Sequence, residues 1–196
     1  QNICTPPRFW ALAASAAALE IGMLSFRPTN PRRVFDHVSG HVLGHVLVPA
    51  LGGGAGIALM IACADAADLP LTLAPFTTSI VLVMCAPGSR FARVRNVLGG
   101  HVLSALAGLG VLLLAGSNPW FAALAVGLAI ALMQASDTMH PPAGINALVM
   151  VLAAPSWTFV LMPVASGALV LVSFAFVYRR GCALLRVDYG GREPPG

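Results

Sequence analysis

Long apolar runs alternate with short polar breaks along most of this chain. Two shorter apolar runs, residues 75–87 and 142–154, each begin at or next to a proline and lie between longer runs. The longer runs approach or reach the ~20 residues that a helix needs to cross a bilayer. They cover about residues 45–64, 97–115, 120–136 and 158–178. The pattern predicts an all-α membrane protein, a helical bundle of about six membrane segments.

The composition supports a membrane protein and argues against a nucleic-acid partner. The chain is 58% hydrophobic and 9% charged, whereas soluble domains carry about 25% charged residues. Every basic residue except histidine is arginine, and the arginines stand in short clusters at the ends of apolar runs. Such clusters are typical of a topology signal. The expected partner is the lipid bilayer; a homo-oligomer stays open.

An internal repeat divides the apolar region into two units. A shift of 67 positions places Pro75 on Pro142 and Gly100 on Gly167. Each unit then reads as a long helix, a short proline-started helix and a long helix. The units cover about residues 45–115 and 119–178. Three crossings per unit give the units opposite orientations, so the pattern predicts two inverted three-helix repeats, an architecture of transporters.

The charges predict which way these repeats face. If six segments cross, the arginines of 27–33, 90–95 and 179–186 lie on one side, and Asp65 and Asp68 lie on the other. Arginine-rich loops favour the cytoplasm. We therefore expect both ends of the core to be cytoplasmic, in a bacterial inner membrane.

The most polar stretch inside the apolar region is DTMHPPAGIN, residues 137–146. Its prolines end one helix and start the next, and the new helix points unpaired amides back at the break. Those amides and the helix dipole can hold a small anion. The first repeat offers hydroxyl groups at the matching helix start, and plain helix capping is the alternative for both. The predicted substrate-binding residues are Pro75, Thr77, Thr78, Ser79, His140, Pro142, Gly144 and Asn146.

Three titratable residues are candidates for coupling a proton to anion movement: His140, His101 and Asp137. A histidine within a membrane segment is a functional candidate because burying it in lipid is costly. Alternatively, the His140 ring hydrogen-bonds a carbonyl freed at the break, and Asp137 caps a helix or pairs with an arginine of residues 90–95.

A second group of histidines allows a different class of function. His37, His41 and His45 repeat at i, i+4 and i+8 and share one helix face, and two such residues can bind a transition metal. A zincin motif also needs a glutamate, which is missing here. We predict no metal and no cofactor, and we take the stripe as a polar face at the membrane interface.

The sequence divides into three segments. Residues 1–33 form an N-terminal extension in which residues 9–26 allow a peripheral helix. Residues 34–180 form the transmembrane domain, and residues 181–196 are expected to be a disordered cytoplasmic tail.

Three stretches give this chain a resemblance to a known family. They are HPPAG at 140–144, RNVLGGHVLSAL at 95–106 and LAPF at 73–76. Together they resemble the HPP family of integral membrane proteins over about residues 34–180. Plastid and cyanobacterial members of that family are linked to nitrite transport, so the resemblance implies a small-anion transporter. The chain departs from the family pattern at Thr77-Thr78, where Gly-Ala is usual, and at Asn146, where a small hydroxyl residue is usual.

The sequence favours a transporter or channel for a small inorganic anion, with nitrite as the first candidate, and does not favour an enzyme. The anion would bind between the two short helices near the membrane midplane. The alternatives are an intramembrane metal-binding protein or enzyme that uses the histidine stripe, and a membrane scaffold without transport.

The topology is testable by accessibility labelling. Single cysteines placed in residues 90–95 and after Tyr178 should both react from the cytoplasmic side, because both segments carry arginine clusters. Labelling from opposite faces would rule out the six-crossing arrangement.

Overall fold

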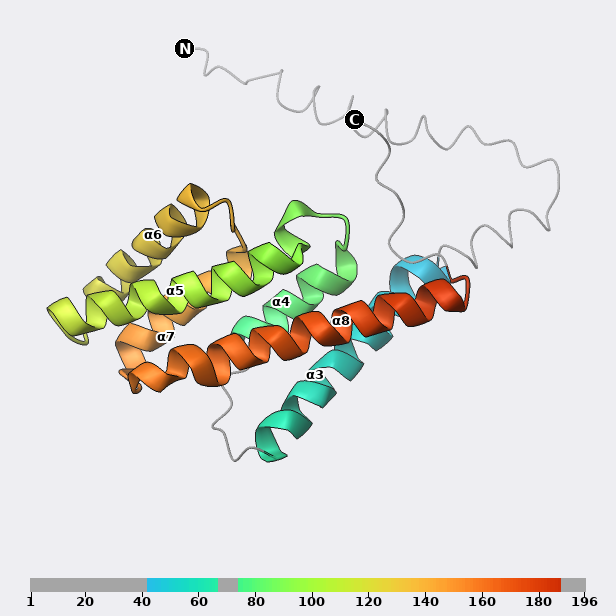
Figure 1. Ribbon diagram of the computed structural model, residues 1–196, viewed down its shortest axis with the longest axis horizontal. Coiled ribbons are helices and arrows are strands. Elements are labelled where there is room, and N and C mark those ends of the chain that lie inside the picture. The colour runs from blue at the N-terminus through green and yellow to red at the C-terminus, as the bar shows by residue number, and fades with distance from the viewer. Residues whose placement is uncertain (1–41, 67–73, 188–196) are drawn as a thin grey trace, which may run out of the picture. The chain divides into compact units, whose positions relative to one another are not determined.

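The computed structural model describes residues 42–66 and 74–187, and these ranges are helical, with no strand. The described residues form six α-helices, which are labelled in Figure 1. They are α3 (Val48–Ala66), α4 (Ala74–Cys85), α5 (Val94–Ala115), α6 (Pro119–Ala135), α7 (Ile145–Ala153) and α8 (Ser166–Leu184). Shorter helical turns are η1 (Leu43–Leu47), η2 (Arg90–Ala92), η3 (Pro141–Gly144), η4 (Trp157–Val160) and η5 (Leu161–Ala165). The all-helical prediction is confirmed.

Three of the described helical segments are long and apolar enough to cross a membrane: Leu43–Ala66, Val94–Ala115 and Trp157–Leu184. The shorter apolar helices are Pro75–Cys85, Pro119–Ala135 and Pro141–Ala153. The two short proline-started segments therefore form where the sequence predicts them. The segment expected at 120–136 forms too, but it is shorter than the three candidate spans.

The end of α6 turns the chain toward the polar stretch. Asp137 adopts a left-handed backbone with φ 52°, a conformation that aspartate tolerates better than most residues. The Thr138 amide bonds the Met133 carbonyl at 2.9 Å, and the Asp137 amide bonds the Gln134 carbonyl at 3.1 Å. This is the Schellman pattern of helix termination. It stops α6 cleanly and turns the chain before the prolines.

The last helix is longer than the sequence predicts. The expected span ends at Tyr178, but α8 continues to Leu184. Arg179 lies within the helix, and its Nη2 donates to the Val83 carbonyl of α4 at 2.8 Å. Residues 181–184 of the expected tail are thus helical. The N-terminal extension 1–33, His37, His41 and residues 188–196 lie outside the described residues.

The α5 helix packs mainly on α6 and α7, and α8 packs on α3, α4 and α5 (Figure 1). Glycines allow the close approach. A Cβ at Gly108 of α5 would lie 2.7 Å from the Met150 Cβ and 2.8 Å from the Ala147 carbonyl oxygen. The same effect occurs at Gly56 of α3, where a Cβ would lie 2.9 Å from Ile80 and Phe174 side chains. Small residues at helix contacts are typical of membrane bundles.

This packing predicts opposite effects for two glycines of one helix. Gly108→Ala should lower the stability by about 1–3 kcal/mol, because backbone atoms of α7 cannot yield to the added methyl group. Gly110→Ala, where a Cβ meets no atom within 4 Å, should be neutral or stabilising by up to about 1 kcal/mol. Thermal unfolding of the purified proteins in one detergent measures both. Equal melting temperatures for the two variants would contradict the α5–α7 packing.

Candidate functional site

The polar stretch after α6 lies against a face of α5 that lacks side chains. A Cβ at Gly99 would lie 2.8 Å from the Thr138 Cγ2, and one at Gly100 would lie 2.7 Å from the His140 Cβ. The Gly100 Cβ would also lie 3.1 Å from the Thr138 carbonyl oxygen. Two consecutive glycines therefore let the chain at 138–140 approach the helix backbone. The side chain of the next residue, His101, then lies beside His140, with the two ring centroids 5.2 Å apart.

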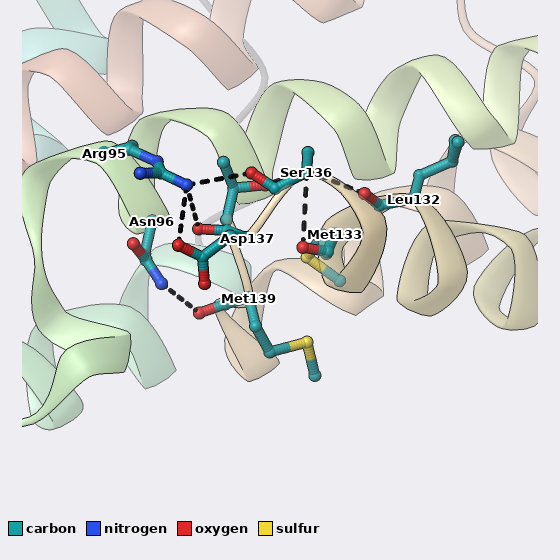
Figure 2. A network of polar contacts seen from close by, with 8 residues as sticks. Arg95, Asn96, Leu132, Met133, Ser136, Asp137 and Met139 are labelled. Atoms are coloured by element: carbon teal, nitrogen blue, oxygen red, sulfur yellow. Dashed lines mark hydrogen bonds and ion pairs between the residues drawn. The ribbon is translucent and has the colours of Figure 1, made fainter.

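Two side chains of α5 hold this stretch in place (Figure 2). Arg95 Nη2 donates to the carbonyls of Ser136 and Asp137 at 3.0 and 2.8 Å and pairs with Asp137 Oδ2 at 2.9 Å. Asn96 Nδ2 donates to the Met139 carbonyl at 2.9 Å. The pairing of Asp137 with an arginine of residues 90–95, one of the two roles expected for it, is thus present.

Four polar side chains meet beyond this contact, and all four are 0% exposed: Ser79, His101, His140 and Asn146. Ser79 Oγ lies 2.9 Å from His101 Nε2 and 2.8 Å from His140 Nε2. Asn146 Nδ2 lies 2.8 Å from His101 Nδ1 and 3.3 Å from the His101 carbonyl oxygen. The histidine cluster, as we call these four residues, joins α4, α5, α7 and the residue before η3.

The partners of the two rings assign their protons. His140 Nδ1 lies 2.7 Å from the Phe91 carbonyl oxygen, which can only accept, so Nδ1 carries a hydrogen. The Asn146 Nδ2 amide group lies near both the His101 carbonyl oxygen and His101 Nδ1. An NH₂ group can only donate, so His101 Nδ1 is an acceptor. A neutral His101 therefore carries its hydrogen on Nε2, which donates to Ser79 Oγ.

Apolar groups close the histidine cluster on one side. The Phe76 ring stacks on the His101 ring with centroids 4.9 Å apart and planes inclined by 19°. Gly167 of α8 makes room for Phe76, because a Cβ there would lie 2.6 Å from that ring. Burial strengthens a hydrogen bond, but a buried polar atom that has no partner costs free energy. Asn146 Oδ1 is such an atom, buried and without a hydrogen-bond partner.

The structure brings together three of the eight predicted substrate-binding side chains, namely Ser79, His140 and Asn146. Pro75 contributes its carbonyl, which accepts from Ser79 Oγ at 2.8 Å. Thr77 and Thr78 are exposed residues, on another side of α4 from Ser79. Thr78 Oγ1 also donates to Pro75, at 3.0 Å.

The remaining predicted residues lie at η3 or next to it. Pro142 and Gly144 belong to η3, and a Cβ at Gly144 would meet no atom within 4 Å. Of the three proton-coupling candidates, His101 and His140 are adjacent, with ring centroids 5.2 Å apart. Asp137 lies outside the histidine cluster, because its exposed carboxylate pairs with Arg95.

Sequence reasoning missed several partners of these residues. Ser104 of α5 accepts from the Ala147 amide at 3.1 Å, so one amide near the start of α7 already has a protein partner. Asn96 and the Phe91 carbonyl were also missed. Ser104, three residues after His101, shares a side of the helix with it, whereas Asn96, five residues before it, is turned away by about 140°. A backbone carbonyl such as that of Phe91 gives no sequence signal.

The metal-binding alternative depends on residues that are only partly described. His45 lies in η1, whereas His37 and His41 lie outside the described residues. Within residues 42–66 and 74–187, no three histidine, cysteine or acidic side chains are grouped to hold a metal ion.

The apolar helices and their buried polar cluster define an integral membrane protein of the all-α class. The chain matches the model of the HPP transmembrane region over residues 39–186 and belongs to this family. The expected resemblance is confirmed.

Two relatives are transmembrane proteins of Dictyostelium discoideum. One is 36% identical over 119 residues, which cover 57% of this chain and 42% of the relative. The other is 35% identical over 113 residues, which cover 54% of this chain and 36% of the relative. The matched region thus spans less than half of either relative. No solved structure matches the chain.

The contacts of the polar stretch predict different effects for a buried and an exposed partner. Asn96→Ala should lower the stability by about 1–3 kcal/mol, because the Met139 carbonyl loses its buried donor. Asp137→Asn should change it by less than about 1 kcal/mol, since exposed ion pairs contribute little and asparagine tolerates the left-handed backbone. Chemical unfolding in mixed micelles measures both variants. A larger loss for Asp137→Asn would show that the ion pair holds the stretch.

Proposed function

We propose that this protein is a transporter or channel for a small inorganic anion, with nitrite as the first candidate, and not an enzyme. The observation that carries the proposal is the histidine cluster, where two short proline-started helix segments meet around fully buried polar side chains. Ionisable residues inside membrane segments are rare and mark ion pathways in many transporters. Short helices that start within a membrane are likewise a feature of transporter binding sites.

The relation between Ser79 and Asn146 supports the inverted repeat. The two residues are separated by the same 67 positions that separate Pro75 from Pro142. In the structure they contact opposite nitrogens of one ring, Ser79 at His101 Nε2 and Asn146 at Nδ1. Equivalent positions of the two repeats thus converge on a single residue of α5. The packing of α5 with α6 and α7, and of α8 with α3 and α4, is compatible with two units that exchange their third helices.

An anion at this point would meet donors from both helix starts. Each helix N-terminus contributes roughly 0.3–1 kcal/mol when exposed and up to ~2 kcal/mol when partly buried. The His101 Nε2–H and the Asn146 amide, which bond Ser79 Oγ and His101 in the described conformation, would add hydrogen bonds on turning to the anion. No arginine belongs to the histidine cluster, so binding would stay weak enough for the ion to leave, as conduction requires.

The site must open for an ion to pass. The four side chains of the cluster contact one another and are 0% exposed in the described conformation. The η3 turn is the best candidate for the moving part. Gly144 has open space around its Cα and a helical φ of −53°, so neither packing nor backbone geometry demands glycine there. Its small size would let an ion approach the η3 backbone.

Flux in proteoliposomes tests the proposal. Purified protein should accelerate nitrite entry over protein-free liposomes. Gly144→Leu should reduce that flux about tenfold or more, which corresponds to a barrier higher by about 1.4 kcal/mol. The open space at this position should let the variant fold and insert.

Gly127→Leu is the matched control, because Gly127 of α6 is also helical and also has no atom within 4 Å of a Cβ. Its flux should equal that of the unsubstituted protein. Unchanged flux in Gly144→Leu would exclude η3 from the pathway. If no small anion enters faster than in protein-free liposomes, the proposed function itself is wrong.

A further inference from the structure

Ser79 Oγ makes three short contacts, but only two hydrogens are available for them when both histidine rings are neutral. Ser79 Oγ has three partners: the Pro75 carbonyl at 2.8 Å, His101 Nε2 at 2.9 Å and His140 Nε2 at 2.8 Å. His101 donates to Ser79, as its Asn146 contact requires. The single Ser79 hydrogen is then shared between the Pro75 carbonyl, which also accepts from Thr78 Oγ1 at 3.0 Å, and the unprotonated His140 Nε2. One of these two short contacts is left without a hydrogen.

One added proton completes the network without moving a heavy atom. A proton taken from water binds His140 Nε2, and the new N–H donates to Ser79 Oγ. The Ser79 hydrogen rotates to the Pro75 carbonyl, and His140 Nδ1–H keeps its bond to the Phe91 carbonyl. Every contact between His140, Ser79, Pro75 and His101 then has one donor and one acceptor. Hydrogen bonds from a charged donor are also stronger than neutral ones.

We propose that His140 is a proton-binding site of this protein, with Ser79 as the rotating hydroxyl that adapts to the proton, and that the proton binds together with the anion. The second part rests on the proposed transport function. A buried imidazolium without a counter-ion is costly, and an anion beside it removes that cost. By linkage, the anion and the proton then increase each other's affinity to the same degree.

The surroundings of His140 do not supply another counter-charge. The titratable group that faces it is His101, whose ring centroid is 5.2 Å away. The other packed elements contribute Ser79 from α4 and the Phe91 carbonyl from η2, neither of which is ionised. Arg90 and Arg93 flank Phe91 and are exposed.

Nearby acidic charge is already neutralised, because Asp137 pairs with Arg95. None of the described residues that hydrogen-bond His140 or face its ring carries a carboxylate. An anion that enters the cluster is the partner that the imidazolium lacks.

The unpartnered oxygen of Asn146 supports the same conclusion. Asn146 Oδ1 is a buried acceptor without a donor, and an anion without a proton would add a further acceptor beside it. A water molecule that accompanies the anion would donate to this oxygen. The ligand class that fits the cluster is thus a small monovalent anion, taken up with one proton on His140 and accompanied by a hydrogen-bond donor for Asn146 Oδ1.

Nitrogen NMR of histidine-labelled protein in lipid bilayers tests the proton site without any transport assay. The readout is the pair of ¹⁵N shifts of the His140 ring over about pH 5–8, the range in which histidine titrates. We expect the imidazolium with two N–H groups at His140 to be a minor fraction without nitrite, because no counter-ion is present, and to rise when nitrite is added. The His140→Gln variant assigns the signal by removing it.

Two variants distinguish the Ser79 contact from a general effect on α4. Ser79→Ala should reduce the imidazolium fraction about fivefold or more, since the charged N–H loses its acceptor. Val81→Ala is the control, because Val81 is an exposed apolar residue of the same helix and its side chain cannot hydrogen-bond Ser79 or Pro75. Its imidazolium fraction should equal that of the unsubstituted protein.

Two results separate this proposal from the proposed function. If His140 stays neutral across this range with and without nitrite, the proton site is wrong, even if nitrite flux is measured. If the imidazolium forms but no small anion crosses the membrane, the proton site stands and anion transport is wrong.

Discussion

The structure depends on how polar side chains are satisfied inside an apolar bundle. Lipid and packed alanines offer no hydrogen-bond partners, so buried polar atoms depend on partners within the protein. The His101 ring lies at the centre of this constraint, with Ser79 at Nε2 and Asn146 at Nδ1. Its partners come from α4 and α7, and Ser79 also contacts His140 before η3. Replacing this ring would remove a hydrogen-bond partner of Ser79 in α4 and of Asn146 in α7.

The glycines of α5 make that arrangement sterically accessible. Gly99 and Gly100 leave room for the chain at 138–140, and Gly108, further along the helix, leaves room for α7. Arg95 and Asn96 then fix the same chain through its carbonyls. The stretch RNVLGGH therefore works as one docking surface for DTMH, and this explains why so few polar residues can order a long break between helices. The break also ends at η3, whose backbone at Gly144 remains open in space.

Much of the helical plan is predictable because a membrane restricts the chain to helices and marks their ends with prolines and arginines. The predicted helix starts also identified Ser79, His140 and Asn146 as candidate site residues. Their convergence on His101 was not predictable, since it depends on helix rotation and on contacts between distant segments. Thr77 and Thr78 show the limit: they adjoin Ser79 in sequence, but the helical period of 3.6 residues turns them to another side. Tyr178 was a premature end for α8, since Arg179 lies within the helix and donates to a carbonyl of α4.

The central claim is that a small anion binds at the histidine cluster, between the two short helices. The most direct measurement is the ¹⁵N–¹⁵N dipolar coupling between labelled nitrite and the ring nitrogens of His101 and His140, recorded by solid-state NMR in lipid bilayers. The account predicts a coupling that corresponds to hydrogen-bonded neighbours and that disappears when unlabelled nitrite is added in excess. Saturable nitrite binding without any coupling to either ring would contradict it.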